Sequence, residues 1–442
     1  MRLQAYPREW LVLLLVALTT LPIVTVVGAQ DTSRLALTES IVLRGRTDID
    51  PYWKLTIDRA FANGHWYSDK APAVSLLAVP VVEGIRVADA IFPHPHSSPV
   101  WTRAWSLWTI RALVGGIAFL GLTLLVGRTA EGFVARAGAP AAVTFGLGTM
   151  AGSLGPTVFG HLQDALALFG AFILGTRARR PRDWLWVGLA AGTGVLFEYP
   201  AGLAALVLVA YAAARSGRWA ALATVAGGVP AALVLGAYDW LSFGAPWRLS
   251  YRYTSNVFTP DQKQNLFGVG FPTGHGIWTL LLDGHGLLLV SPVILAASAG
   301  LVPYWRRSRL EAVTAAAIVA IFLFSTAGYF LPNGGLSPGP RFAAAALPFL
   351  FLGLPFALAR WPLPTLLLSA LSVGVGLFDE LTWSVANRLD FETWPETVWS
   401  LTGVSRRLGS IAFLATGAVT VLLVAAALVG RRFEERPRGV LQ

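Results

Sequence analysis

Cysteine is absent from this chain of 442 residues, so no disulfide framework, thiolate metal site or cysteine nucleophile is available. Charge is scarce: Asp, Glu, Lys and Arg together make up 13% of the residues, and the only lysines are Lys54, Lys70 and Lys263. The sequence also lacks a Gly-rich phosphate loop, a dinucleotide-binding fingerprint and any nucleic-acid-binding motif. The net charge of +10 therefore needs an explanation other than a nucleic-acid partner.

Hydrophobic residues, by contrast, form 55% of the chain and recur in runs of roughly 20. A mean hydropathy of +0.60 does not suit a soluble globule. We therefore expect an all-α polytopic membrane protein with one transmembrane domain over residues 1–442 and about twelve transmembrane helices. The candidate spans are 9–28, 104–127, 140–160, 163–176, 184–200, 201–215, 219–241, 285–304, 311–330, 342–359, 363–379 and 409–430.

The distribution of arginine predicts the orientation of these spans. If both termini are cytoplasmic, the cytoplasmic segments carry 18 of the 34 basic residues, as the positive-inside rule expects. The first span has no clear cleavage site, so we expect it to be retained as an anchor in the plasma membrane. The extracytoplasmic segments are then chiefly 29–103, 243–284 and 380–408, and we expect 243–284 to cover the site.

The apolar stretch 71–93 is excluded from this count, because counting it would place the arginine-rich segment 176–183 outside the cell. Glu83, Arg86 and Asp89 fall on one arc of a helix, and apolar residues cover much of the rest. This pattern favours a juxtamembrane helix at the interface. The alternative is a true span whose charged residues face the bundle.

Ionisable residues near the outer ends of the spans are costly in a membrane, so Asp164, Glu198, Asp239 and Arg341 are functional candidates. A structural ion pair or a helix cap explains each of them individually about as well.

Ordered motifs give the chain a resemblance to a known group. An acid and an arginine follow the first span in Asp31-Thr-Ser-Arg34, and a Gly-x-x-Tyr turn precedes a lysine in Gly64-His-Trp-Tyr67-Ser-Asp69-Lys70-Ala-Pro72. Further elements are Phe159-Gly-His161-Leu-Gln-Asp164, Phe243-Gly-Ala-Pro246, Gly286-Leu-Leu-Leu-Val-Ser-Pro292 and Gly334-Gly-Leu-Ser-Pro-Gly-Pro-Arg341. Together they resemble the GT-C superfamily of integral-membrane glycosyltransferases, particularly bacterial relatives of protein O-mannosyltransferases and the lipid A aminoarabinose transferase. The chain departs from that pattern in having Thr32 where many relatives have a second acid.

The resemblance implies an enzyme that moves a hexosyl or pentosyl group from a polyprenyl-phosphate donor to an acceptor hydroxyl at the extracytoplasmic face. The acceptor is a protein, a lipid or a glycan. Asp31 is the preferred general base, with Glu39 as the alternative, and Asp164 is a third catalytic candidate that orients the acceptor or the sugar. Lys70 and Arg341 suit the donor phosphate. One base without a second nucleophile favours inversion.

Further substrate-binding candidates are Arg34, His65, Tyr67, Asp69 and His161. Arg34 is expected to form an ion pair that keeps Asp31 ionised. Solvated or capping histidines and an interfacial aromatic belt are the simpler explanations for His65, His161 and Tyr67. Asp48 and Asp50 resemble a cation-binding pair, but a turn explains them equally well, so no metal and no cofactor are assigned.

Two other classes of function compete with this interpretation. Twelve spans with cytoplasmic termini also suit a secondary transporter or lipid flippase, for which Arg111, inside the second span, is the residue to probe. A catalytically inactive GT-C-like scaffold would tolerate the loss of Asp31. The gathering of acids and phosphate-suited cations at the outer face favours the glycosyltransferase.

Overall fold

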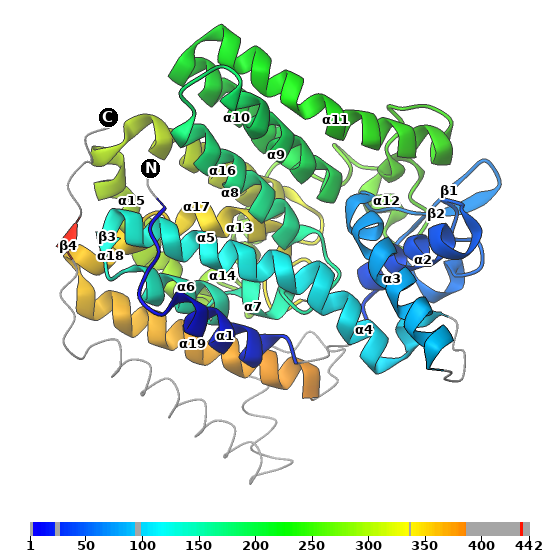
Figure 1. Cartoon of the computed structure of the whole chain (residues 1–442), viewed down its shortest axis with the longest axis horizontal. Coiled ribbons are helices and arrows are strands. Elements are labelled where there is room, and N and C mark those ends of the chain that lie inside the picture. The colour runs from blue at the N-terminus through cyan, green and yellow to red at the C-terminus, as the bar shows by residue number, and fades with distance from the viewer. Residues whose placement is uncertain (1–2, 23–26, 93–98, 336, 386–433, 436–442) are drawn as a thin grey trace. The chain divides into compact units, whose positions relative to one another are not determined.

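The computed structural model describes residues 3–22, 27–92, 99–335, 337–385 and 434–435 (Figure 1). The chain forms two compact units. One comprises Met1–Thr25, Phe119–Leu154 and Phe271–Gln442, and the other comprises Val26–Ala118 and Gly155–Gly270. We call them the first and the second unit. The expected last span, 409–430, and most of the expected outer loop 380–408 lie outside the described residues.

The second unit carries most of the sequence motifs. Its elements are α2 (Ala29–Arg44), η1 (Trp53–Leu55), β1 (Arg59–Ala62), β2 (His65–Ser68), α3 (Ala73–Ile91), η2 (Val100–Thr102), α4 (Ala104–Arg111), η3 (Ala112–Gly116), α8 (His161–Arg177), α9 (Asp183–Phe197), α10 (Ala201–Ser216), α11 (Arg218–Phe243), η4 (Ser250–Tyr253) and α12 (Thr259–Gln262).

Helix α2 begins and ends at glycines for identifiable reasons. Gly28 is the N-cap, and its backbone N–H donates to the Asp31 carboxylate three residues later, as in a capping box. Gly45 takes the left-handed conformation, with φ 61°, that ends many helices. Helix α2 packs against α3, so the segment after the first apolar helix is folded structure rather than an open loop.

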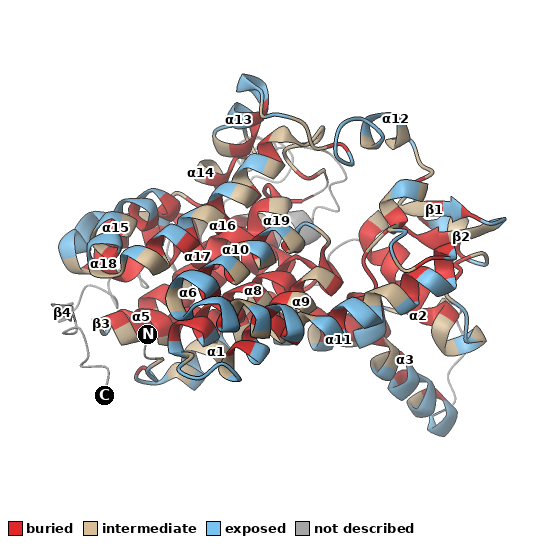
Figure 2. Cartoon of the chain, turned by 90° about the horizontal axis from the view of Figure 1, so that it is seen from above, coloured by how far each residue is buried: buried red, intermediate tan, exposed pale blue. Residues whose placement is uncertain are grey.

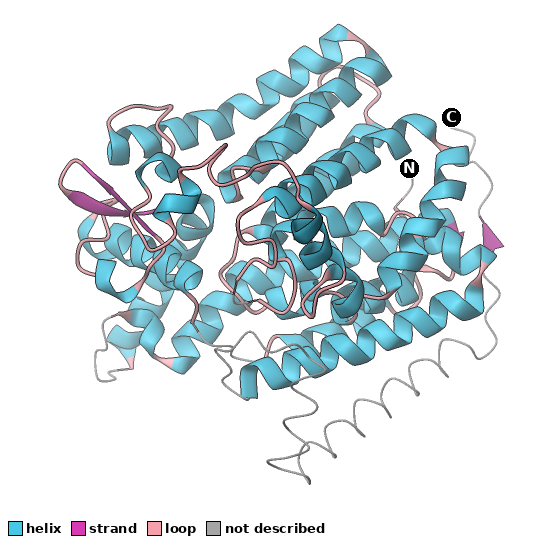
Figure 3. Cartoon of the chain, turned by 180° about the vertical axis from the view of Figure 1, so that it is seen from behind, coloured by secondary structure: helices cyan, strands magenta, loops and turns pink. Residues whose placement is uncertain are grey.

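A β-hairpin interrupts the otherwise helical second unit, as the magenta arrows of Figure 3 show. Strands β1 and β2 are antiparallel, with Ala62 opposite His65, which leaves a two-residue loop. Both loop residues, Asn63 and Gly64, have positive φ angles of 53° and 82°. Asn-Gly in this geometry matches the twist of a hairpin, and it delivers Lys70 just past the end of β2.

Most of the stretch 71–93 forms the helix α3, and most residues of its last two turns are exposed, Asp89 excepted (Figure 2). Within the described chain α3 is not among the helices that are long and apolar enough to span a membrane. Glu83 and Arg86 are exposed and pair with each other, whereas Asp89 is buried and pairs with Arg103 at 2.5 Å. Arg103 lies between η2 and α4 and reaches Asp89 near the end of α3. The three charged residues of α3 therefore do not share one environment.

Helices α8 to α11 form a packed group in which α9 contacts α8, α10 and α11. Close approach of α9 and α11 requires glycine, since a Cβ at Gly188 would lie 1.8 Å from the carbonyl oxygen of Thr224. These four helices carry His161, Asp164 and Asp239, and Glu198 directly follows α9.

The first unit is helical, with two short strands. Its elements are α1 (Glu9–Thr20), α5 (Ile117–Phe133, whose first two residues belong to the second unit), β3 (Val134–Ala135), α6 (Gly138–Leu147), α7 (Met150–Leu154), α13 (Gly274–Leu281), α14 (Leu287–Val290), α15 (Val293–Arg307), α16 (Arg309–Gly328), η5 (Arg341–Ala346), α17 (Leu347–Leu350), α18 (Leu354–Arg360), α19 (Pro362–Val385) and β4 (Glu434–Glu435).

Four described helices are long and apolar enough to cross a membrane: Ala104–Phe133, Arg218–Phe243, Arg309–Gly328 and Pro362–Glu380. A pair bent by 51°, Arg341–Leu350 with Leu354–Arg360, would make a fifth. Shorter apolar helices are Glu9–Thr20, Gly138–Leu147, Asp183–Phe197 and Ala201–Ser216. They coincide with expected spans, and the total of about twelve stays a prediction.

Candidate active site

Helix α2 buries an unusual number of polar side chains, which is costly unless each of them is paired. Those that are at most 6% exposed are Gln30, Asp31, Thr32, Ser33, Arg34, Thr38, Glu39 and Ser40. The helix is therefore built around polar contacts rather than an apolar face. Its partners come from α3, α4, the end of α9, the hairpin and the segment before α8, all within the second unit.

Asp31 is surrounded by hydrogen-bond donors. Its Oδ2 lies 2.5 Å from Arg111 Nη2, and its Oδ1 accepts a hydrogen bond from the Val158 backbone N–H at 2.8 Å. The residue sits in the first turn of α2, where the helix dipole favours a negative charge. Oδ2 also accepts the Gly28 N–H at 3.4 Å, so these contacts suit a carboxylate and leave an acceptor position on Oδ1. Asp31 is 1% exposed.

The backbone around Arg111 is shaped to bring both donors to Asp31. Arg111 ends α4 and is followed by η3, a single π-helical turn, a device that is frequent at functional sites. Within that turn, a Cβ at Gly115 would lie 2.2 Å from the Thr157 carbonyl oxygen and 2.6 Å from that of Gly155. Glycine at 115 thus lets the segment before α8 approach and present the Val158 N–H.

The expectation that Arg34 pairs with Asp31 is wrong. Arg34 Nη2 lies 2.6 Å from Glu198 Oε1, and its Nη1 donates to Gln30 Oε1 at 2.9 Å. Arg34 is directed towards the C-terminal end of α9, which leaves Asp31 to Arg111. Arg111, a candidate for a conduction role in the transporter interpretation, is instead one half of a buried ion pair.

Glu198 also connects α2 with the start of α8. His161 Nδ1 lies 3.6 Å from Glu198 Oε1, and a Cβ at Gly160 would lie 2.6 Å from the same oxygen. Asp164, one turn further along α8, is 2% exposed, and its Oδ1 has no hydrogen-bond partner among the described residues. His161 and Asp164 therefore belong to the polar group around Glu198.

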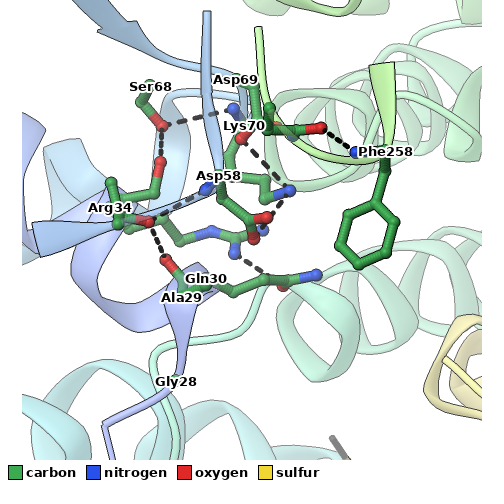
Figure 4. Close-up of polar contacts among 12 residues, drawn as sticks. Gly28, Ala29, Gln30, Arg34, Asp58, Ser68, Asp69, Lys70 and Phe258 are labelled. Atoms are coloured by element: carbon green, nitrogen blue, oxygen red, sulfur yellow. Dashed lines mark hydrogen bonds and ion pairs between the residues drawn. The ribbon is translucent and has the colours of Figure 1, made fainter. Parts of the chain in front are cut away.

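Lys70 follows the hairpin and lies between two carboxylates (Figure 4). Its Nζ is 3.1 Å from Asp58 Oδ2 and 3.2 Å from Asp69 Oδ1. Burial raises the pKa of Asp69 to about 6, an effect that Lys70 opposes and Asp58 reinforces. We call Lys70, Asp58 and Asp69 the lysine cluster.

A pair of serines joins the lysine cluster to α2. Ser33 Oγ and Ser68 Oγ lie 2.8 Å apart, and Ser68 Oγ accepts a hydrogen bond from the Lys70 backbone N–H at 3.2 Å. The helix that carries Asp31 and the turn that carries Lys70 are thus held together by side-chain contacts (Figure 4).

His65 belongs to the hairpin and its support rather than to the groups around α2. His65 Nδ1 lies 2.6 Å from Asp50 Oδ2, and Asp50 Oδ1 accepts the Trp66 N–H at 2.7 Å. Asp48, Asp50 and His65 each place one possible ligand atom within 4.8 Å of the others, a spacing compatible with a metal ion.

The surroundings of Asp48 do not suit a metal ligand. Burial alone would raise its pKa, but Arg44 at 2.8 Å and Arg46 at 2.5 Å outweigh that effect and lower it. With two guanidinium groups already on Asp48, these residues fit a hydrogen-bonded support of the hairpin, and we assign them no ion.

Three predicted site residues have contacts away from the groups around Asp31, Glu198 and Lys70. Glu39 Oε2 accepts the Val100 backbone N–H at 2.8 Å, so this carboxylate holds η2. The ring of Tyr67 packs against Phe243, with centroids 5.2 Å apart. Arg341 begins η5 in the first unit, with its guanidinium 5.2 Å from the centre of the Phe342 ring.

The partners of the principal residues are harder to predict from the sequence than those residues. Arg111 stands out only as a charge inside an expected span, and Asp58 does not stand out. A signal exists for Arg111, since an arginine inside an apolar helix requires a buried acid. Nothing local distinguishes Asp58, which meets Lys70 only because the hairpin folds back.

A comparison with solved structures finds a similar fold. The structure of ArnT from Cupriavidus metallidurans in the apo state is similar to this chain, with a TM-score of 0.55 and 15% sequence identity over 95% of this chain and 72% of that one. Two structures of the Archaeoglobus fulgidus oligosaccharyltransferase, one of them with an inhibitory peptide and a dolichol-phosphate, have TM-scores of 0.47 and 0.46 at 14% identity. They match 98% of this chain, which spans 57% and 56% of their lengths.

No protein-family model matches the chain, and no curated protein matches it. At 15% identity the likeness to ArnT is one of fold. The fold shared with ArnT agrees with the fold that the motif resemblance implies.

Proposed function

We propose that this chain is a membrane glycosyltransferase that moves a hexosyl or pentosyl group from a polyprenyl-phosphate donor to an acceptor hydroxyl, with inversion. The observation that carries the proposal is the pair of groups joined through Ser33 and Ser68: a buried carboxylate, Asp31, and a cation suited to phosphate, Lys70. The ArnT-like fold supports the same class of reaction.

Asp31 acts as the general base in this proposal. It takes the proton of the acceptor hydroxyl while that oxygen attacks the anomeric carbon, a contribution of roughly 100- to 10,000-fold for a positioned base. Arg111 and the Val158 N–H hold the carboxylate in place, so Arg111 is a positioning residue. Asp164 and His161 are candidates for contacts with the sugar or the acceptor.

Lys70 stabilises the leaving phosphate, on which negative charge develops as the glycosidic bond breaks. Arg341 is proposed for the same phosphate from the sequence resemblance. The positive-inside distribution of arginine supports placing this chemistry at the extracytoplasmic face of the plasma membrane. A lipid-linked donor fits that side, where soluble nucleotide sugars are not supplied.

The test is a transfer assay in nanodiscs with a panel of radiolabelled polyprenyl-phosphate sugars. Wild type is compared with Asp31→Asn, Lys70→Ala and the control Asp261→Asn, which changes an exposed acid of α12. We expect transfer or sugar release by wild type and by the control, with a loss of at least about 100-fold in Asp31→Asn.

Three outcomes would contradict the proposal. Full activity in Asp31→Asn would exclude Asp31 as the general base. Donor binding without turnover for any acceptor would favour the scaffold interpretation. Movement of intact donor across a liposome membrane, dependent on Arg111, would favour a flippase.

A further inference from the structure

The lysine cluster carries more negative than positive charge. Lys70 contributes one positive charge, and Asp58 and Asp69 contribute two negative charges when both are ionised. All three side chains are largely buried, with 11% of Lys70, 14% of Asp58 and 2% of Asp69 exposed. A cation proposed for phosphate is therefore already neutralised by the protein itself.

Other charged and polar groups around Asp69 do not remove this excess. The positive charge of Arg34 on α2 lowers the pKa of Asp69, but the Arg34 guanidinium is itself paired with Glu198 at 2.6 Å. Tyr199 and Tyr238 are within electrostatic range of Asp69, and Ser250 of η4 donates to the Asp69 carbonyl oxygen at 2.8 Å. Among the described residues, Lys70 and Arg34 are cations whose charge opposes the effect of burial at Asp69, and Arg34 is already shared with Glu198. Asp239 of α11 lies near the same two tyrosines and adds a further acid, not a cation.

A phosphate that approaches Lys70 must meet both carboxylates at close range. Like charges a few ångströms apart repel strongly where water is excluded. Binding therefore requires that one carboxylate be neutralised or moved. The two differ in how they can respond.

Asp69 is enclosed and cannot turn to solvent, so neutralisation by a proton is the response open to it. Burial already raises its pKa to about 6, and an added anion would raise it further. Asp58 precedes β1, and its backbone N–H is held by Thr56 Oγ1 at 3.1 Å. Its side chain is the more exposed of the two, so it can release Lys70 without unfolding the turn.

We propose that donor binding at Lys70 is coupled to the uptake of one proton by Asp69 and to the release of Asp58, so that the lysine cluster is a proton-linked gate for the phosphate. This inference rests on the proposed function. The proton comes from solvent and stays on the Asp69 carboxyl group while the phosphate is bound. In the absence of a donor, Asp58 and Asp69 both lie against the Lys70 ammonium.

The experiment uses the full chain in nanodiscs and methyl farnesyl phosphate as the probe. This phosphodiester has no second ionisable proton near neutrality, unlike a phosphate monoester. A change of its affinity with pH therefore reflects the titration of groups on the protein. Isothermal titration calorimetry between pH 5.5 and 8, in two buffers of different ionisation enthalpy, gives the affinity and the number of protons taken up.

For wild type we expect the affinity to fall about tenfold per pH unit above roughly pH 6, with close to one proton taken up at pH 7.5. Asp69→Asn should bind with no pH dependence and no proton uptake. Asp58→Asn should bind about tenfold more tightly at pH 7.5, because one repelling charge is gone. The exposed control Asp261→Asn should behave as wild type.

Failure of this inference is distinguishable from failure of the proposed function. Binding that is lost in Lys70→Ala but is flat with pH, with no proton uptake in wild type, overturns the gate and keeps the phosphate site. Absence of wild-type binding at every pH overturns the phosphate site itself. The proton count needs only wild type, so a variant that fails to fold does not prevent a decision.

Discussion

At the residue scale, the second unit has two buried ion pairs on one helix, Asp31 with Arg111 and Arg34 with Glu198. Each side chain is at most 9% exposed. Buried pairs add little net stability, because desolvation offsets the attraction, yet removing one partner leaves a charge stranded. Such pairs are therefore better explained by the geometry they fix than by the stability they give.

A double-mutant cycle tests this explanation for Asp31 and Arg111. Arg111→Met alone should lower the free energy of unfolding by about 3–5 kcal/mol, because the Asp31 carboxylate is then buried without its partner. Asp31→Asn combined with Arg111→Met should recover most of that loss while remaining inactive. Thermal unfolding in detergent and the transfer assay measure the two effects. Additive losses in the double variant would contradict the explanation.

The raised pKa of Asp69 predicts a pH dependence of stability. The folded state holds this proton up to about pH 6, whereas the unfolded chain releases it near 3.8, so folding binds a proton between these values. Stability should therefore fall as pH rises from about 4 to 6 and change little above that for this group. Comparing melting temperatures of wild type and Asp69→Asn across this range isolates the effect, which should vanish in the variant.

At the element scale, the π-helical turn η3 is the feature on which Asp31 depends most. It follows Arg111 directly and contains Gly115, against which the carbonyl oxygens of Gly155 and Thr157 pack. One turn of helix thus sets both donors to the proposed base.

Gly115→Ala should misplace the Val158 N–H, because a Cβ at this position overlaps the Thr157 carbonyl. We expect a loss of stability of about 1–3 kcal/mol and a larger proportional loss of transfer activity. The matched control is Gly84→Ala in α3, where a Cβ meets nothing within 4 Å, and this variant should be neutral or slightly stabilising. Equal behaviour of the two variants in the transfer assay would refute the role given to η3.

The helices of the packed group are predictable because each is a continuous apolar run between arginine-rich or proline-containing turns. The hairpin is not predicted, although Asn63-Gly64 is a strong turn signal, because hydropathy marks the surrounding segment only as polar. The span expected at 342–359 corresponds to η5, α17 and α18, a helix pair bent by 51°, with prolines at Pro348 and Pro355 near the helix starts. Hydropathy alone does not register such breaks.

The sequence identifies the individual polar residues better than their partners. Asp31, Arg34, Lys70 and Asp164 all lie in the second unit, and their motifs mark them. Arg111 meets Asp31 across 80 positions of sequence, and Glu198 meets Arg34 across 164. Pairings over such separations depend on tertiary packing, which a single sequence does not specify.

At the scale of the whole molecule, the predicted phosphate ligands belong to different compact units, with Lys70 in the second and Arg341 in the first. The predicted role of Arg341 in phosphate binding is therefore tested within the first unit, separately from Lys70.

The measurement compares the affinity of wild type and Arg341→Ala for methyl farnesyl phosphate, with Arg360→Ala as a control in the first unit. We expect Arg341→Ala to weaken binding by about 1.5–3 kcal/mol, as for the loss of a hydrogen bond to a charged group, and Arg360→Ala to leave it unchanged. Unchanged binding in Arg341→Ala would assign Arg341 another role.

The indoles of Trp53 and Trp66 stack with centroids 4.7 Å apart and planes 6° from parallel, and the Arg59 guanidinium lies 4.7 Å from each ring centre. Two aromatic chromophores at this separation couple electronically, so the hairpin should carry a near-ultraviolet circular dichroism signal of its own. Because Trp66 lies four residues before Lys70, that signal is a built-in optical reporter of the turn. A donor that displaces Asp58 should be seen spectroscopically, without a label, in a chain that has no cysteine to attach one to.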